Sequence, residues 1–189
     1  MNAPDTLLPL LPTSRVLTRD GVFTDDPWPL RATDARSDGS DSIDRIDDSE
    51  PALLPLAAYL AQPQPAVHGL WLAPDDDPAL LATQLAGHLA SVPLIAIQFP
   101  RVADGRGYSL AHLVRRLGYA GDLRAIGEVL VDQLFMMKRV GFSSFALRAD
   151  QHDDDALAAL RRYDDAYQAA FDQPLPAYRR GRRVQGASR

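Results

Sequence analysis

Cysteine is absent from the chain, and its absence excludes several kinds of chemistry. A protein without cysteine forms no disulfide, uses no thiolate nucleophile, and holds neither Cys-ligated zinc nor a Cys-held iron–sulfur cluster. Redox chemistry would therefore need another carrier. Lack of cysteine fits a reducing compartment, and we expect a cytoplasmic protein.

Lysine is almost absent as well, since Lys138 is the only one among 20 basic residues. Arginine elsewhere favours directional, bidentate contacts with anions, or reflects the base composition of the genome. The net charge is −5 and the isoelectric point is near 5.3. Nucleic-acid binding needs a basic face, so we expect no nucleic-acid partner.

Long apolar runs are also missing. The first residues, MNAPDTLLPLLPTSR, lack a basic leader, and Pro9 and Pro12 interrupt their apolar stretch. We therefore predict neither a signal peptide nor a membrane-spanning helix. With 46% hydrophobic residues over 189 positions, the chain can still bury one core of ordinary domain size.

Named catalytic and cofactor motifs are missing too. The sequence has no Walker A loop, no GxGxxG fingerprint and no GxSxG elbow. Its histidines have no metal spacing such as HxxxH, and the acidic stretch over 32–50 lacks the closing glutamate of an EF-hand. We therefore predict no metal site, and the sequence names no cofactor.

What the sequence does contain is an alternation of strands and helices. Asp20-Gly21 predicts a hairpin between strands over 15–18 and 22–24, and residues 51–62 predict a short helix. Four strands, each followed by a helix, come next. The expected strands are 67–72, 92–99, 123–129 and 142–147, and the expected helices are 78–90, 109–117, 131–140 and 153–171.

This order indicates the α/β class, with four βα units in a parallel sheet and an N-terminal β-hairpin. The sheet resembles half of a (β/α)8 barrel or a small open sheet. Half a barrel leaves strand edges and one face uncovered, so we expect a homodimer.

Composition divides the chain into three parts. Residues 1–50 hold the hairpin and a mobile acidic loop, residues 51–173 form the α/β domain, and residues 174–189 are a disordered basic tail. The acidic residues of the loop are Asp34, Asp38, Asp41, Asp44, Asp47, Asp48 and Glu50.

The stretch Asp104-Gly105-Arg106-Gly107 follows an expected strand and opens an expected helix with Ser109 as its N-cap. Glycines that reach positive φ, a helix N-terminus and arginines can together hold phosphate or sulfate. The alternative is a structural turn in which Arg106 binds an acidic neighbour. The anion-binding set that we predict is Arg101, Asp104, Gly105, Arg106, Gly107, Tyr108, Ser109 and Arg148.

Glu128 and Asp132 follow the next strand and are the candidate catalytic pair. Two carboxylates at the carboxyl ends of parallel strands can perform acid–base work. The alternative gives both a structural role, with Asp132 capping its helix and Glu128 paired with Arg101, Arg106 or Arg124. Rim ion pairs are common, which favours this alternative.

The central motif resembles a bacterial family, domain of unknown function 934. The resemblance rests on Phe99-Pro100, Asp104 to Ser109, Leu113, Arg115 to Tyr119, Gly121 to Ala125, Gly127 to Leu130, Asp132 to Leu134, Arg139, Gly141-Phe142 and Phe145, and upstream on Leu54 to Leu56 and Leu72 to Asp77. Members of the family often have cysteine at the position of Val140 and aspartate at that of Ser143.

The resemblance implies a role in sulfur assimilation, because genes of this family tend to lie beside those of assimilatory sulfite reductase. Its members are often labelled oxidoreductases of sulfite reduction. With no redox motif in the chain, we expect a cytoplasmic accessory protein that binds the sulfite reductase machinery or a small oxyanion. The alternatives are an enzyme acting on a phosphorylated or sulfated small molecule, and an oligomeric scaffold without a ligand.

Overall fold

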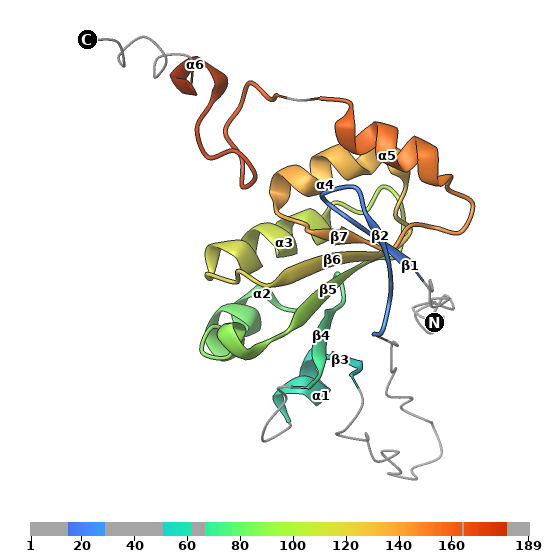
Figure 1. Ribbon diagram of the computed structural model, residues 1–189. Helices are drawn as coiled ribbons and strands as arrows, with labels where there is room; N and C mark the ends of the chain where they lie inside the picture. The colour runs from blue at the N-terminus through green and yellow to red at the C-terminus, as the bar shows by residue number, and fades with distance from the viewer. Residues whose placement is uncertain (1–14, 29–50, 62–66, 164, 181–189) are drawn as a thin grey trace, which may run out of the picture.

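A computed structural model describes residues 15–28, 51–61, 67–163 and 165–180. Seven strands form one sheet in the order β2-β1-β7-β6-β5-β4-β3 (Figure 1). The strands are β1 (Arg15–Thr18), β2 (Phe23–Asp25), β3 (Leu53–Pro55), β4 (Gly69–Leu72), β5 (Leu94–Phe99), β6 (Asp122–Gly127) and β7 (Ser144–Phe145). The helices are α1 (Leu56–Leu60), α2 (Pro78–Leu80), η1 (Leu81–Leu85), η2 (Leu89–Ser91), α3 (Arg106–Arg116), η3 (Val131–Gln133), α4 (Leu134–Val140), α5 (Asp153–Arg161) and α6 (Ala177–Arg180).

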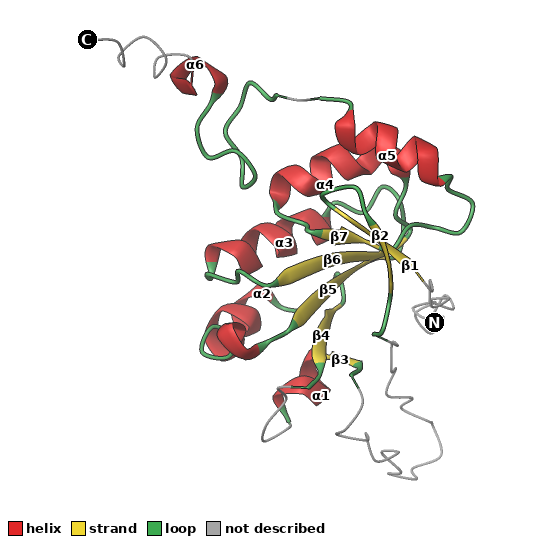
Figure 2. Ribbon diagram, viewed as in Figure 1, coloured by secondary structure: helices red, strands yellow, loops and turns green. Residues whose placement is uncertain are grey.

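The sheet is mostly parallel, which confirms the α/β class. Strands β3 to β7 are neighbours in chain order and run parallel, whereas β1 is antiparallel to both β7 and β2. When crossovers are right-handed and always step in one direction, their helices lie on one side of the sheet. Helices α3, α4 and α5 accordingly share one side (Figure 2).

Burial of β5 on both of its faces explains its continuous apolar run. Ile95, Ile97 and Phe99 belong to the main core, whereas Leu94 and Ala96 belong to a smaller cluster on the opposite face. The other buried members of this second cluster are Val16, Leu53, Ile126 and Ala146. These side chains are buried within one chain, although the sequence predicted that this face would be uncovered. The homodimer stays a prediction.

Residues 51–62 do not form the single helix that the sequence predicted. Leu53 and Leu54 are 1% and 0% exposed in strand β3, and Leu53 is paired with Gly69 of β4. Helix α1 starts directly afterwards, at Leu56. A short apolar run bounded by prolines fits a strand or a helix equally well, and the partner strand decides between them. The parallel part of the sheet therefore has a strand more than predicted.

Three more elements differ in extent from the predictions. The expected helix over 78–90 is interrupted, because α2 passes into the π-helical turn η1 and is followed by the 3₁₀ turn η2. Strand β7 is confined to Ser144–Phe145, and α5 ends at Arg161. Helices α3 and α4 end close to their predicted ends, before Gly118 and Gly141, whose φ angles are 95° and 112°.

Residues 165–180 form a segment that we call the arm, which leads away from the helices (Figure 1). The Nη1 atom of Arg139, in α4, lies 2.9 Å from Asp172 Oδ1, and the two side chains are 9% and 18% exposed. The Phe171 N–H donates to the Arg139 carbonyl oxygen at 3.1 Å, and the Arg115 guanidinium lies 4.9 Å from the centre of the Phe171 ring. These contacts attach the arm to the helical layer.

Only some residues of the predicted tail and of the predicted N-terminal part are described by the structure. The tail predicted to be disordered includes Ala177–Arg180, which form α6. The predicted acidic loop over 32–50, the first 14 residues and residues 181–189 of the predicted tail lie outside the described residues. In the described part of the chain, every helix is too short or too polar to cross a membrane.

Candidate functional site at the rim of the sheet

The carboxyl ends of β4 to β7 come together at one edge, which we call the rim: residues 73–77, 100–108, 128–133 and 146–152. Ligands of parallel α/β sheets bind at such edges. Backbone hydrogen bonds connect the loops that follow β5, β6 and β7. The Glu128 N–H donates to the Phe99 carbonyl at 2.8 Å, and the Arg148 N–H donates to the Val129 carbonyl at 3.1 Å. The rim is therefore a connected surface.

Two glutamines that the sequence analysis did not select strengthen these connections. Gln133 Nε2 donates to the Val102 carbonyl at 2.7 Å, and Gln133 Oε1 accepts from the Leu130 N–H at 3.2 Å. Gln151 Oε1 accepts from the Val131 N–H at 3.0 Å. The signal available in the sequence was a glutamine within each of two strand-to-helix loops, but only the strand order shows what each one reaches.

The stretch from Asp104 to Gly107 forms the first turn of a helix. Helix α3 begins at Arg106, so Ser109 lies inside the helix and is not the N-cap that we predicted. The N-cap residue is Gly105, and Asp104, directly before it, accepts through Oδ1 from the Arg106 N–H at 3.0 Å. Asp104 therefore occupies the helix N-terminus where the sequence predicted a bound anion.

The glycines of this stretch do not adopt the positive φ that the sequence analysis expected. Gly105 has a φ of −77°, and Gly107 is not among the glycines with positive φ. A Cβ atom on Gly107 would lie 2.6 Å from Cζ of the Phe99 ring, whereas one on Gly105 would meet nothing within 4 Å. Tyr108 packs edge-on against the same ring, with centroids 5.4 Å apart. Gly107 is thus explained by close packing on Phe99.

Arg106 is bound by its acidic neighbour, the second of our two interpretations. Its Nε and Nη2 atoms lie 3.0 and 2.7 Å from the Asp104 carboxylate oxygens. The Arg106 side chain is 59% exposed and that of Asp104 is 11% exposed. The hydrogen bond from Arg106 lowers the pKa of Asp104, with a smaller contribution from the charge of Arg101.

Glu128 and Arg148 meet at the rim, as the strand order requires. Arg148 Nη1 lies 2.8 Å from Glu128 Oε2, so the expected pairing of Glu128 with Arg101, Arg106 or Arg124 is wrong. The same guanidinium forms a bidentate ion pair with Asp150, with Nε–Oδ1 and Nη2–Oδ2 distances of 2.7 Å each. The hydrogen bonds that Arg148 donates to Asp150 and Glu128 raise the pKa of Arg148. The same hydrogen bonds to Asp150 lower the pKa of that carboxyl group.

Asp132 is separate from this ion pair and does not cap its helix as predicted. The N-cap of η3 is Leu130, and Asp132 is exposed in the first turn. Burial raises the pKa of the Tyr108 hydroxyl, and the negative charge of Asp132 raises it further. Asp132 therefore acts electrostatically on Tyr108, whereas Glu128 contacts Arg148.

The loop after β4 adds three aspartates to the rim. Asp77 accepts from the Ala79 N–H at 2.8 Å and caps α2. Asp76 accepts from the Ala73 N–H at 2.7 Å, and burial raises its pKa. Asp75 is exposed, and its charge adds to the effect of Asp104 in raising the pKa of Arg106. The DGRG turn and the loop after β4 thus share one electrostatic environment.

Carboxylates outnumber arginines at the rim. The acidic residues are Asp75, Asp76, Asp77, Asp104, Glu128, Asp132 and Asp150, and the basic residues are Arg101, Arg106 and Arg148. Within the described ranges, no three His, Cys, Asp or Glu side chains form a group that could hold a metal ion. The rim therefore presents a negative surface in which two arginines are already bound by carboxylates.

Residues 69–178 match the model of a family described as bacterial protein of unknown function (DUF934). The chain belongs to this family. No curated protein and no solved structure matches the chain. The DUF934 match includes the rim and most of the arm, whereas β1, β2, β3 and α1 precede it.

Proposed function

We propose that this DUF934 protein is an accessory protein of assimilatory sulfite reduction that binds a basic partner surface through its rim. The observation that carries the proposal is the charge arrangement. Arg106 and Arg148, the cations best placed for an oxyanion, are each bound at two nitrogens by an aspartate. The excess of carboxylates then favours a cationic partner.

The link to sulfite reduction rests on the family resemblance, and the non-catalytic role rests on the residues. The chain has no cysteine and no dinucleotide fingerprint, so electrons for sulfite reduction would travel on a partner. An acidic rim accelerates encounter with a basic protein and sets its orientation. Hydrogen bonds join the three rim loops that follow β5, β6 and β7, so binding at these loops requires little ordering.

The experiment is co-purification of sulfite reductase with tagged protein from cells that assimilate sulfate. Asp75→Lys and Asp132→Lys reverse exposed charges at the rim. Asp20→Lys is the matched control, because the turn after β1 lies at the opposite end of the sheet, where β1 runs antiparallel to β7. We expect the rim variants, but not the control, to lose the enzyme, and we expect added salt to weaken binding. Equal recovery with all variants contradicts the proposal.

A small oxyanion at the DGRG loop is the alternative ligand for the same accessory role. It would have to replace the Asp104 carboxylate at the N-terminus of α3 and on Arg106. A thermal-shift panel with sulfate, sulfite and phosphate tests this alternative. A stabilisation that is present in the wild type and absent in Arg106→Ala would favour the oxyanion. A flat panel leaves protein binding as the function.

Catalysis by Glu128 and Asp132 is the competing proposal. In the accessory role, Glu128→Gln keeps sulfite reduction in cells, because the amide oxygen can still accept a hydrogen bond from Arg148. Loss of sulfite reduction in a folded Glu128→Gln protein that still recovers the enzyme would favour catalysis.

Light scattering on the pure 20.7 kDa chain tests the homodimer, for which we expect twice the monomer mass.

A further inference from the structure

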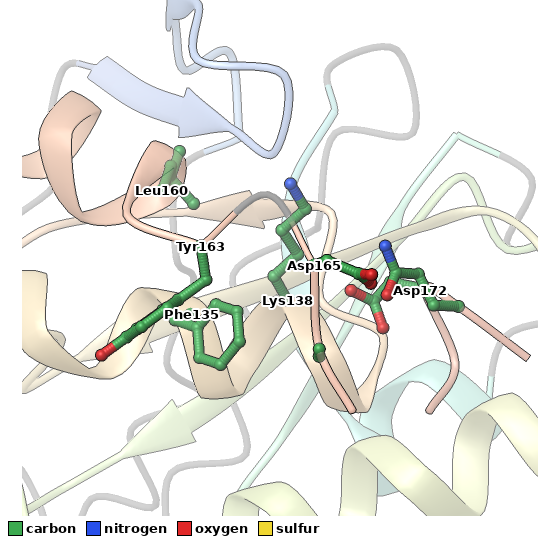
Figure 3. A pocket seen from close by; sticks show the side chains of 8 residues that line it. Phe135, Lys138, Leu160, Tyr163, Asp165 and Asp172 are labelled. Carbon is green, nitrogen blue, oxygen red and sulfur yellow. The ribbon is translucent and has the colours of Figure 1, made fainter. Parts of the chain in front are cut away.

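A pocket of about 230 Å³ lies between α4, the end of α5 and the arm (Figure 3). Phe135 and Tyr163 line one side of it, and Lys138 stands between them and the carboxylates of the arm. None of its lining residues belongs to the rim. Its volume is below the roughly 300–1,000 Å³ of pockets for drug-sized ligands, so its ligand is small.

The charges around this pocket leave one positive charge without a partner. Asp172 is paired with Arg139 at 2.9 Å, and Asp165 is paired with Arg180. Among the described residues, no carboxylate lies within ion-pair distance of Lys138. Among the described lining residues and their partners, two pairs and one lysine give a net positive site, which an anionic group complements.

A second polar group in the pocket lacks a partner. The Oε1 atom of Gln173 is buried, and no donor in the described part of the chain reaches it. The backbone fixes this residue, because the Ala170 N–H donates to the Gln173 carbonyl at 2.9 Å. A buried acceptor without a hydrogen bond is unfavourable, so a ligand that donates to Gln173 Oε1, once the amide turns towards the pocket, would bind more tightly.

The third feature is an aromatic surface. The rings of Phe135 and Tyr163 have centroids 4.8 Å apart at an angle of 55°. Tyr163 is 57% exposed, so part of this aromatic surface is open to solvent. A ligand ring that packs on this pair would remove apolar surface from water.

We propose that the pocket binds a small aromatic hydroxycarboxylate. Its carboxylate binds the Lys138 ammonium, its hydroxyl donates to Gln173 Oε1, and its ring packs on Phe135 and Tyr163. The inference does not depend on the function proposed for the rim. Because Gln173 belongs to the arm and Lys138 to α4, binding would also hold the arm against the helix.

The experiment uses the unique lysine of the full-length chain. Labelling with ¹³Cε-lysine gives a single lysine side-chain signal, which Lys138→Met assigns by deleting it. We expect phenyllactate to shift this signal saturably. Calorimetry on the unlabelled variants should show roughly tenfold or weaker binding for Lys138→Met and Gln173→Leu. Lys138→Arg should bind nearly as well as the wild type, because it keeps the charge.

Two further ligands test each contact separately. Phenylacetate lacks the hydroxyl and should bind more weakly than phenyllactate, whereas 2-phenylethanol lacks the carboxylate and should not move the Lys138 signal. Arg19→Met removes a positive charge at the exposed turn after β1 and should not change binding. An unmoved lysine signal with phenyllactate, or equal affinity in Lys138→Met, overturns the proposal. Equal binding of phenylacetate overturns the contact with Gln173.

Discussion

At the scale of single residues, the two glycines of the DGRG turn are expected to respond differently to alanine. At Gly107 the new Cβ would lie 2.6 Å from the buried Phe99 ring, and at Gly105 it would meet nothing within 4 Å. We expect Gly107→Ala to lower the free energy of unfolding by about 1–3 kcal/mol through overpacking. Gly105→Ala should raise it by up to about 1 kcal/mol, since its φ of −77° suits alanine.

Urea denaturation of both variants measures these changes. Gly105→Ala is the matched control, because it makes the same substitution two residues away in the same turn. Equal stability of the two variants would show that Phe99 does not require glycine at position 107. The contact between the Phe99 ring and the backbone of α3 at Gly107 would then be contradicted.

The ion pair between Asp104 and Arg106 predicts a dependence on pH. Its bond to Arg106 lowers the pKa of Asp104 from the ordinary 3.8, so the folded protein holds this carboxylate ionised more strongly than the unfolded chain does. The stabilisation is fully present above the ordinary pKa and is lost as the pH falls through it towards the lower folded value.

Arg106→Met should therefore lower stability more at pH 7 than at pH 3. Urea midpoints of the wild type and the variant at the two pH values give this difference. The prediction is contradicted if Arg106→Met lowers the free energy of unfolding by the same amount at both pH values. Arg101→Met is a useful control, because Arg101 contributes only a smaller charge effect to Asp104.

Sequence reasoning located the residues of the rim but not all of their pairings. The choice between anion binding and an Asp104–Arg106 pair depends on whether α3 begins at residue 106 or at residue 109. The first residue of a helix can be predicted from sequence only to within a few residues. At α3 this range covers the whole stretch from Asp104 to Gly107. The Glu128–Arg148 pair joins residues 20 positions apart, and only the β6–β7 pairing brings them together.

At the scale of elements, Arg124 connects β6 to the segment that follows β2. Its guanidinium lies 2.5 Å from Asp26 and 3.3 Å from Asp122, and its side chain is 6% exposed. Arg124→Met would leave two carboxylates without their cation. We expect the free energy of unfolding to fall by about 3–5 kcal/mol, as for other broken buried pairs.

The control for this prediction is an exposed ion pair two strands away from β6 in the sheet. Arg15, in β1, is paired with Asp153, and the side chains are 47% and 52% exposed. Arg15→Met should change the free energy of unfolding by less than about 1 kcal/mol. Thermal denaturation of both variants gives the comparison. A loss below 1 kcal/mol in Arg124→Met would contradict the role of this pair.

The elements that the sequence predicted well have strong local signals. Strand β5 has a continuous apolar run, and Gly118 and Gly141 end their helices as left-handed residues. Strand β3 was missed because it has only three residues, and its strand conformation depends on pairing with β4. The continuous helix over 153–171 was wrong because Tyr163, Tyr167 and Phe171 follow a helical spacing but remain 57%, 68% and 47% exposed.

At the scale of the whole molecule, the class of fold could be predicted from the order of strands and helices. The position of the arm could not be predicted in this way. The spacing of βα units is a pattern along the chain, so it is visible without coordinates. The arm is held by contacts of Arg139 and Arg115 with residues 171 and 172, about 30 and 55 positions away. Contacts of this range leave no periodic signal.

The arm should open more easily than the sheet unfolds, and Asp172 should control its opening. Asp172→Ala leaves the Arg139 guanidinium, whose side chain is 9% exposed, without its carboxylate. The Phe171 N–H is bound to the Arg139 carbonyl oxygen, so we expect chymotrypsin to cleave after Phe171 mainly when the arm leaves the helices, and cleavage then follows the population of the open state. We expect Asp172→Ala to be cleaved at least about tenfold faster, which requires a loss of only about 1.4 kcal/mol.

Asp165→Ala is the matched control within the arm. Its partner is Arg180, and the Asp165 side chain is 60% exposed, so the loss of this pair should change the cleavage rate little. Mass spectrometry of the fragments identifies the cut after Phe171. Equal cleavage rates in the two variants would mean that the Arg139–Asp172 pair does not hold the arm. The pocket that contains Lys138 would then lack a fixed wall, because Asp172 and Gln173 line it from the arm.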